Sequence, residues 1–183
     1  VPRALLNRAA VYAVPNMNPD GSYLGNLRVN AAGANLNREW ADPSEEKSPE
    51  VFHVRRRMQE EGIDLCLDVH GDEAIPHNFI AGPEGVPSFS KRQAKLLKNY
   101  KDALLQANPD FQLKHGYPAN RPGKANLKIG ANWIAERFGC LSMTLEMPFK
   151  DVDDGTEQRQ GWSPARSRAL GRSNLDAIRA GLG

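Results

Sequence analysis

The sequence predicts an α/β fold in which a sheet is layered between helices. Short apolar runs bounded by turn residues recur along the 183-residue chain, as expected for buried strands. Between these runs lie longer segments whose apolar residues recur at helical spacing and which begin and end at capping residues. Strands and helices that alternate in this way favour a sheet covered by helices, and ligands of such sheets bind beyond the carboxyl ends of the strands.

The N-terminal third of the chain carries one predicted strand and one predicted helix. Residues 9–14 are apolar and precede Pro15, so we expect them to form a buried strand. Residues 15–47 are rich in Asn, Gly, Pro and Asp, and a segment of this length without periodicity is usually functional inside a domain. A helix is predicted from Ser48 to Gly62, because Ser-Pro-Glu supplies an N-cap, a proline at the first position and an acid in the first turn.

The middle of the chain continues the alternation. A second buried strand is predicted at residues 63–69 and a short third strand at 79–81. The clearest helix is 90–107, since its apolar side chains recur on one face and Asn-Pro follows it. A basic loop is expected at 114–128, followed by a short helix at 131–138.

The last predicted elements are a strand and a helix. Residues 141–147 form an apolar strand interrupted by polar side chains, among them Glu146. Ser163 and the proline after it then repeat the cap signature, which predicts a helix to about residue 181. We find no internal repeat and no low-complexity linker.

Composition excludes several classes of protein. Hydrophobic residues make up 40% and charged residues 25%, the balance of a globular rather than a disordered chain. No run approaches the roughly 18 apolar residues of a membrane span, and no basic start followed by an apolar stretch suggests a signal peptide. Cys66 and Cys140 lie in apolar runs and are expected to be buried free thiols. These features predict a cytoplasmic protein with no membrane partner.

The formal net charge of +2 conceals an uneven distribution of charge. Residues 91–128 carry nine basic and two acidic side chains, which raises the possibility of a nucleic-acid-binding surface. However, the lysines between 91 and 101 lie on the predicted helix, where a solvated face is the ordinary interpretation, and no nucleic-acid motif accompanies them. We therefore predict no nucleic-acid partner, and the sequence leaves the oligomeric state open.

Polar residues collect where three of the predicted strands end, and the first of these strands runs into the polar segment 15–21. His70 follows an apolar strand and opens a glycine turn among acids, which is a common setting for a metal ligand. His70 and Glu73 also form an HxxE string, in which Glu73 either binds the same metal or only shapes the turn. Glu146 ends an apolar strand, where a carboxylate is costly unless it has a partner. It is therefore either a general base or half of a structural ion pair.

The long polar segment adds two arginines that lie beside asparagines. Arg28 occurs in GNLRVN, and Asn37 and Arg38 occur in NLNREW. A guanidinium beside an amide suits a carboxylate or a developing oxyanion. The alternative is that both arginines stabilise the loop through nearby acids.

Three strings together resemble the zinc metallocarboxypeptidase (funnelin) family, and within it the cytosolic-carboxypeptidase-like branch. The strings are VPNMNPDGSYLGNLRVNAAGANLNREW at 14–40, LDVHGDEAIPHNF at 67–79 and MTLEMPFKD at 143–151. They follow the order and spacing of that family. The resemblance implies a three-layer α/β/α fold around a mixed sheet, and removal of the C-terminal residue from a peptide or protein with Zn²⁺ as cofactor.

The resemblance also implies a role for each matching residue. His70 matches the third zinc ligand of the family, and Glu146 matches the catalytic glutamate that takes a proton from the attacking water. Arg28 matches the arginine that polarises the scissile carbonyl. Asn37 and Arg38 match the pair that binds the terminal carboxylate of the substrate, which would make the enzyme act on chain ends.

The chain departs from the family at its start. The first two zinc ligands of the family come from an HxxE motif before the NPDG loop, whereas Val1–Ala10 contain neither histidine nor glutamate. His70 and Glu73 cannot be that motif because they follow the loop. We therefore expect residues 1–183 to be a partial catalytic domain that lacks its N-terminal part. The mobile tyrosine of the family has one weak match, Tyr117, which we leave out of the catalytic set.

The sequence suggests a substrate preference and leaves two other classes of activity open. In this family the loop after the long helix lines the pocket for the leaving side chain, so four basic residues would favour acidic C-terminal residues. These residues are Lys114, Arg121, Lys124 and Lys128. A zinc amidohydrolase that acts on small acyl-amino acids is the second candidate, and a non-catalytic fragment is the third.

Overall fold

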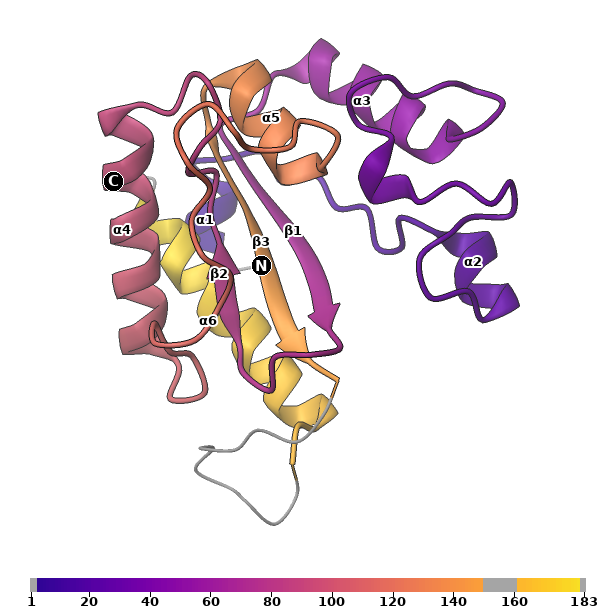
Figure 1. Cartoon of the computed structure of the whole chain (residues 1–183). Coiled ribbons are helices and arrows are strands. Elements are labelled where there is room, and N and C mark those ends of the chain that lie inside the picture. Colours follow the sequence, from indigo (N-terminus) through magenta and orange to yellow (C-terminus); the bar gives the residue numbers. More distant parts are fainter. Residues whose placement is uncertain (1–2, 150–160, 182–183) are drawn as a thin grey trace.

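The computed structural model describes residues 3–149 and 161–181. Its elements, in chain order, are α1 (Arg3–Leu6), α2 (Pro19–Leu24), η1 (Leu36–Arg38), α3 (Pro49–Glu61), β1 (Leu65–Asp72), β2 (Phe79–Ala81), α4 (Lys91–Ala107), α5 (Gly130–Phe138), β3 (Leu141–Pro148) and α6 (Pro164–Gly181). Figure 1 shows the strands at the centre, with α4 and α6 on one side and α2 and α3 on the other.

The described strands form one mixed sheet in the order β1-β3-β2. β3 lies in the middle, parallel to β1 and antiparallel to β2. The register between β1 and β3 runs from Leu65 opposite Leu141 to Asp72 opposite Pro148. Because these two strands are parallel, their carboxyl ends meet at the same edge of the sheet.

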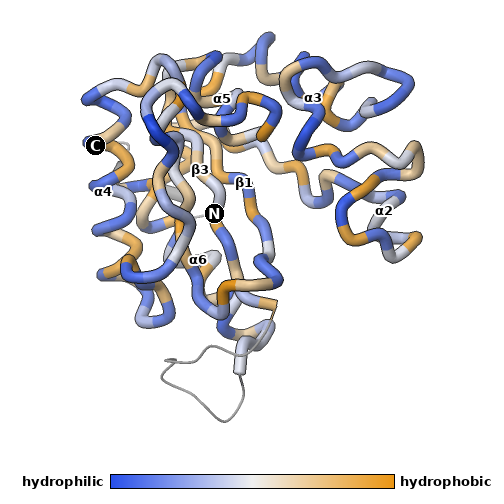
Figure 2. Tube along the Cα trace, viewed as in Figure 1, coloured by the Kyte–Doolittle hydropathy of each residue, from blue (hydrophilic) through white to orange (hydrophobic). Residues whose placement is uncertain are grey.

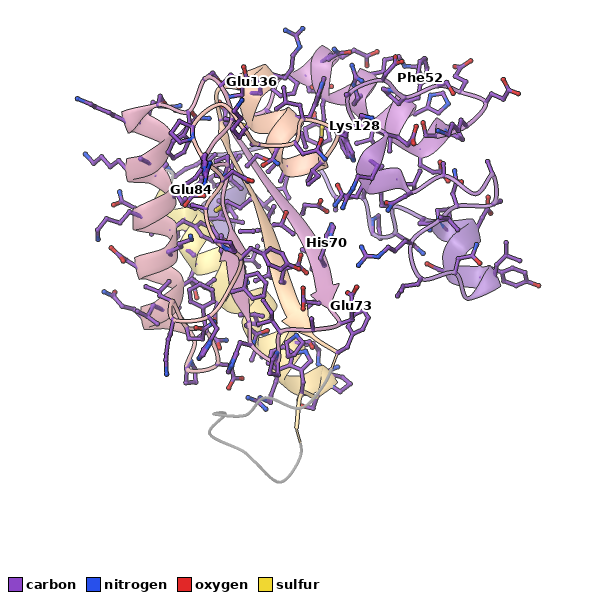
Figure 3. All side chains as sticks on the ribbon, in the orientation of Figure 1. Phe52, His70, Glu73, Glu84, Lys128 and Glu136 are labelled. Carbon is purple, nitrogen blue, oxygen red and sulfur yellow. The ribbon has the colours of Figure 1, made fainter. Side chains whose placement is uncertain are left out.

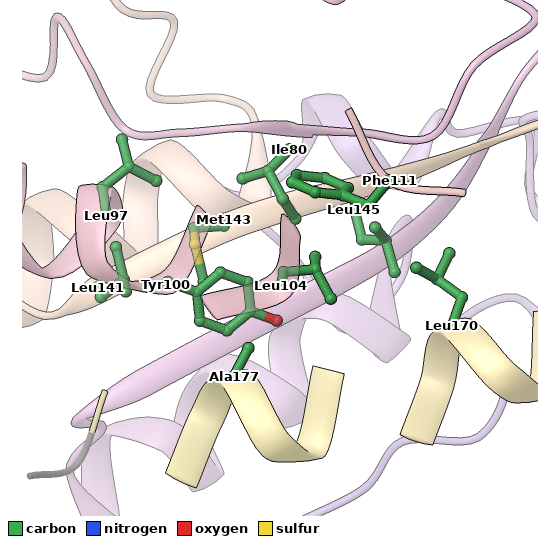
Figure 4. Close-up of a cluster of buried hydrophobic side chains, with 10 residues drawn as sticks. All are labelled: Ile80, Leu97, Tyr100, Leu104, Phe111, Leu141, Met143, Leu145, Leu170 and Ala177. Atoms are coloured by element: carbon green, nitrogen blue, oxygen red, sulfur yellow. The ribbon is translucent and has the colours of Figure 1, made fainter. Parts of the chain in front are cut away.

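One face of the sheet carries the larger hydrophobic core. Alternate residues of β3 point to this face, namely Leu141, Met143 and Leu145. They pack against α4 and α6, whose Leu104 and Leu170 are fully buried. Figure 4 shows this cluster, including the ring of Tyr100 between the two helices.

The opposite face of the sheet supports a second core. Val51 from α3 and Ile134 from α5 pack there with Trp40 and Cys140. Helices therefore cover both faces, and the three-layer α/β/α arrangement around a mixed sheet is confirmed. Helices can cover a sheet because each has one apolar face. Figure 2 shows this along α4, where hydrophobic positions recur between hydrophilic ones.

The predicted helices agree with the structure to within two residues. The helix expected from Ser48 to Gly62 is α3, although the Ser48 side chain accepts from the backbone of Ser44 rather than capping the helix. α4 begins at a complete capping box, in which Ser90 and Gln93 each accept from the backbone N–H of the other. α5 and α6 begin within one residue of the predicted positions.

The strand predicted at residues 9–14 is wrong. The segment has no regular structure, and Val11, Tyr12 and Val14 are about half exposed. A strand needs a neighbour to satisfy its backbone N–H and C=O groups, and no strand in the described part of the chain lies beside this segment. The long polar segment that follows is also not wholly irregular, since it contains α2 and η1.

The strand predicted at residues 63–69 extends further than expected. β1 continues through His70 and Gly71 to Asp72, because β3 pairs with it along its whole length. A side chain at Gly71 would collide with the Phe149 ring, so glycine here lets the ring lie over the strand. His70 therefore lies inside the strand rather than in a turn after it.

Buried polar contacts join the C-terminal helix to the rest of the domain. Arg166 of α6 forms two hydrogen bonds with the Asp110 carboxylate, at 2.7 and 3.0 Å, and both side chains are about 10% exposed or less. Asn108 donates to Ser173, also across the α4–α6 interface. These bonds hold α6 in one position against α4.

Two expectations from composition can be compared with the structure. Cys140 is buried, Cys66 is partly buried, and neither forms a disulfide, so both are free thiols. Among the helices that the structure describes, none is both long enough and apolar enough to cross a membrane.

Candidate active site

His70 and Glu146 are neighbours because β1 and β3 are paired in register. The two residues are opposite each other in the parallel pair, and His70 Nδ1 lies 3.9 Å from Glu146 Oε1. Side chains alternate between the two faces of a strand. Leucines at odd-numbered positions therefore enter the large core, while Asp68, His70, Thr144 and Glu146 share the other face. The same alternation that builds the core thus separates it from the polar site.

Glu146 is a buried carboxyl with an unsatisfied oxygen. Only 6% of the residue is exposed, and no described residue forms a hydrogen bond with its buried Oε2. Burial raises the pKa of Glu146 to about 7, and Asp72, Asp68 and Glu73 add to this shift, whereas His70 opposes it. A carboxyl with a pKa near neutrality can both take up and release a proton during a reaction at that pH.

His70 is positioned by a second carboxylate. Its Nε2 lies 2.9 Å from Asp68 Oδ2, and both side chains are about one-third exposed. Burial lowers the pKa of His70, but the hydrogen bond and the charge of Asp68 outweigh that effect, so the pKa is raised. Figure 3 shows His70 beside the carboxyl-terminal half of β1 and Glu73 just beyond the end of the strand.

Arg28 is brought to the site by hydrogen bonds of the asparagines around it. Asn18 accepts from Gly21 at the start of α2, and both Asn18 and Asn26 donate to the backbone carbonyl of Val29. The guanidinium of Arg28 forms an ion pair with Glu73, and both side chains are about half exposed. A guanidinium has five N–H donors, so this pair leaves donors that can reach a ligand.

Asn37 and Arg38 lie in η1, which is attached to the start of α5. The Asn37 Oδ1 atom accepts from the backbone N–H of Gly130 at 2.9 Å, so the amide of Asn37 caps the first residue of α5. A Cβ at Gly130 would lie 2.8 Å from the Trp40 ring, which shows how closely the ring approaches the helix. Arg38 donates to the Asn37 carbonyl at 2.7 Å, and its side chain is exposed.

All five residues that the sequence singled out line one pocket of about 330 Å³. These residues are Arg28, Asn37, Arg38, His70 and Glu146. Their shared position follows from the fold, because η1, the loop after α2 and the ends of two strands meet here. The volume lies within the range of pockets that bind small ligands. Their individual roles stay predictions.

The pocket also contains residues that the sequence analysis did not assign to the site. Tyr117 lines it, and its hydroxyl donates to the Asp72 carboxylate. Lys101 and Glu84 also line it, and Lys101 Nζ lies 3.9 Å from Glu84 Oε1. No local sequence pattern distinguishes Lys101 from the other lysines of α4, and none identifies Glu84.

The basic lining expected from the loop at 114–128 is wrong. Tyr117 and the three residues after it line the pocket, but the four basic residues of that loop do not, and all four are exposed. Long charged side chains on a surface loop are better hydrated when they extend into solvent. The cationic groups that do line the pocket belong to Arg28, Arg38 and Lys101.

The described residues fit part of a zinc site. His70 has one nitrogen on Asp68 and the other turned towards Glu146, whose buried oxygen lacks a partner. An imidazole with a carboxylate on its other nitrogen is a typical zinc ligand. However, the described part of the chain contains no group of three or more His, Cys, Asp or Glu side chains placed to hold a metal ion. Among the described residues, His70 therefore stays the predicted ligand of a site that they do not complete.

A family model described as zinc carboxypeptidase matches residues 2–167, which is most of the chain. The chain belongs to the zinc carboxypeptidase family. The resemblance seen in the three sequence strings is thereby confirmed. The family is also consistent with the site, because His70 and Glu146 lie within the matched residues.

Relatives of this zinc carboxypeptidase chain include bacterial and animal proteins. An uncharacterised protein of Zymomonas mobilis is 54% identical over 175 residues, which are 96% of this chain and 46% of that protein. Cytosolic carboxypeptidase 6 of Caenorhabditis elegans is 25% identical over 74% of this chain and 30% of its own length.

A solved structure is also similar to this zinc carboxypeptidase chain. It is a metallo-carboxypeptidase from Pseudomonas aeruginosa in complex with (2-guanidinoethylmercapto)succinic acid, with a TM-score of 0.88 and 48% identity. The match covers 93% of this chain and 46% of that one. This chain therefore spans about half the length of that structure and of the Zymomonas protein.

Proposed function

We propose that this chain is part of a zinc-dependent exopeptidase that removes the C-terminal residue from peptides or proteins. The observation that supports it best is the shared pocket, which contains a buried carboxyl of raised pKa, an imidazole and two guanidinium groups. Hydrolysis of an amide needs a base for the attacking water, charge to stabilise the oxyanion and a means of orienting the substrate. The pocket offers a candidate for each of these tasks.

Glu146 is the proposed general base. Its pKa of about 7 suits a group that takes a proton from water and passes it to the leaving amine. Arg28 is the proposed oxyanion stabiliser, using N–H donors that Glu73 leaves free. Asn37 and Arg38 are the proposed carboxylate clamp, because the Asn37 oxygen is occupied by Gly130 and no described residue accepts from its amide nitrogen.

His70 is the proposed zinc ligand of this chain. When bound, zinc would supply Lewis-acid chemistry, lowering the pKa of a water and polarising the carbonyl. Catalytic zinc has about three protein ligands, and His70 is one. We therefore propose that residues 1–183 are a partial catalytic domain and that the other ligands lie on a segment of the same protein outside them. The length of the relatives, about twice that of this chain, supports this proposal.

We propose that the leaving residue has an acidic side chain and that the ammonium group of Lys101 binds its carboxylate. Lys101 extends from α4 into the pocket, and its distance of 3.9 Å from Glu84 leaves ammonium donors for a substrate carboxylate. The alternative is a basic side chain read by Glu84. That alternative is favoured by the ligand of the Pseudomonas protein, whose name contains a guanidino group, although the same ligand is also a dicarboxylic acid.

A panel of peptides that differ only in their C-terminal residue tests the substrate proposal in the full-length protein with zinc. We expect Glu or Asp to be released faster than Lys or Phe. Substitution K101M should reduce the release of acidic residues, whereas the matched control K98M, on the 75% exposed side chain of the same helix, should not. Faster release of Lys or Arg, lost in E84Q, would instead establish the basic alternative.

Two further variants test the chemistry. E146Q should retain zinc and lose roughly 10²–10⁴-fold in kcat, the usual contribution of a general base. H70A should lose zinc, as measured by metal analysis. Hydrolysis of small acyl-amino acids but not of peptides would favour an amidohydrolase, and absence of bound zinc in the full-length protein would favour a non-catalytic role. A cytoplasmic location also stays a prediction.

A further inference from the structure

Asp68 is a carboxylate whose position the proposed chemistry does not explain. It lies on β1 two residues before His70, so the two side chains share one face of the strand. Aspartate is disfavoured in strands, and opposite it in β3 is the uncharged Thr144. Its contact with His70, at 2.9 Å, is the one close polar contact of its carboxylate among the described residues. This contact is therefore the feature to be explained.

The contact determines which nitrogen of His70 is available. A carboxylate can only accept a hydrogen bond, so the atom that faces Asp68, Nε2, must carry the proton. A neutral imidazole has one N–H, and the other nitrogen then has a free lone pair. That nitrogen, Nδ1, is on the side of Glu146, 3.9 Å from its Oε1. This distance is too long for a hydrogen bond, so in the neutral ring the Nδ1 lone pair faces Glu146 without a hydrogen bond.

We propose that Asp68 is a positioning residue that holds the His70 ring with its Nε2–H outward and its Nδ1 lone pair towards the pocket, ready for zinc. The proposal rests on the proposed function, because it assumes that His70 binds zinc. Carboxylates behind a ligand histidine fix its tautomer and orientation, and their loss typically reduces metal affinity 10- to 100-fold. Asp68 is suited to this role because the rigid strand holds both residues at a fixed spacing.

The experiment compares three substitutions in the full-length protein, with zinc affinity measured by competition with a chelator. D68A removes the hydrogen-bond acceptor, and we expect zinc to bind 10- to 100-fold more weakly. D68N keeps an amide oxygen that can accept from Nε2–H, so its loss of affinity should be smaller. D64N is the matched control, because Asp64 is an exposed aspartate just before the same strand, and its affinity should equal that of the wild type.

A second measurement detects the hydrogen bond itself in the metal-free protein. The Nε2–H proton of His70 should exchange slowly and give a downfield NMR signal, assigned by its absence in H70Q. We expect this signal in the wild type, D68N and D64N but not in D68A. A purely structural role for Asp68 would not remove the signal while leaving the fold intact.

The outcomes separate this inference from the proposed function. If H70Q binds zinc as tightly as the wild type, the proposed function fails at its zinc ligand, and the inference loses its premise. If H70Q loses zinc but D68A binds it with wild-type affinity, or keeps the Nε2–H signal, the positioning role is wrong while the proposed function stands.

Discussion

Substitution E146Q should stabilise the protein once metal has been removed. Glu146 is 6% exposed, and its Oε2 has no hydrogen-bond partner among the described residues, so its charged form is poorly solvated. Glutamine has nearly the same shape without the charge. A residue kept for chemistry at a cost in stability is expected at active sites.

The magnitude follows from the pKa of Glu146. Burial raises this pKa from 4.5 to about 7 in the folded protein. Each pKa unit corresponds to about 1.4 kcal/mol, so the shift corresponds to about 3 kcal/mol. A carboxyl whose pKa is higher when folded favours the folded state at low pH, and that contribution is lost as the pH rises from 4.5 to about 7. Above neutral pH, the free energy of unfolding of E146Q should therefore exceed that of the wild type by up to about 3 kcal/mol.

Urea unfolding with a chelator present, over a series of pH values from acidic to alkaline, measures this difference. The two proteins should have equal stability below the unfolded-state pKa and should diverge as the pH rises. Glu45, which is exposed, supplies the control, because E45Q should show no such divergence. A constant difference between E146Q and the wild type across the series would refute the reasoning, as would a wild type that is more stable at alkaline pH.

Three further substitutions test the packing. L104A should lower the free energy of unfolding by about 2–5 kcal/mol in urea titrations, because Leu104 is fully buried, whereas L105A at the exposed neighbouring position should cost far less. G130A should cost about 1–3 kcal/mol and change Trp fluorescence, since the new Cβ would lie 2.8 Å from the Trp40 ring; an unchanged spectrum and stability would contradict this. D110N should lower the thermal midpoint markedly, because breaking a buried ion pair costs about 3–5 kcal/mol. A midpoint equal to that of the wild type would show that the pair with Arg166 contributes little.

Local sequence patterns were sufficient for most of the helices and strands. α4 is a clear case, because its apolar face, its capping box and the Asn-Pro after it all act within a few residues of one another. The candidate site residues were also recognisable, since His70, Glu146 and the NPDG loop occur in specific strings. The segment 9–14 shows the limit of this approach. Its apolar pattern is that of a strand, but strand formation depends on a neighbour that the segment does not have among the described residues.

The lining of the pocket could not be read from local patterns. Lys101 looked like one of several solvated lysines on a helix, yet it reaches the pocket, whereas the basic residues of the loop at 114–128 point elsewhere. Whether a long side chain enters a cavity depends on the orientation of its element in the fold. The same holds for Glu84, whose neighbourhood in the sequence carries no signal.

The sequence by itself therefore determined the α/β class, the family and the candidate residues of the site, because these depend on residue type, spacing and order. Only the tertiary structure decided that His70 and Glu146 are opposite each other and that the Asp68 carboxylate lies 2.9 Å from the His70 ring nitrogen Nε2. The physical reason is that these relations depend on strand register, and register is set by the packing of Leu141, Met143 and Leu145 against α4 and α6.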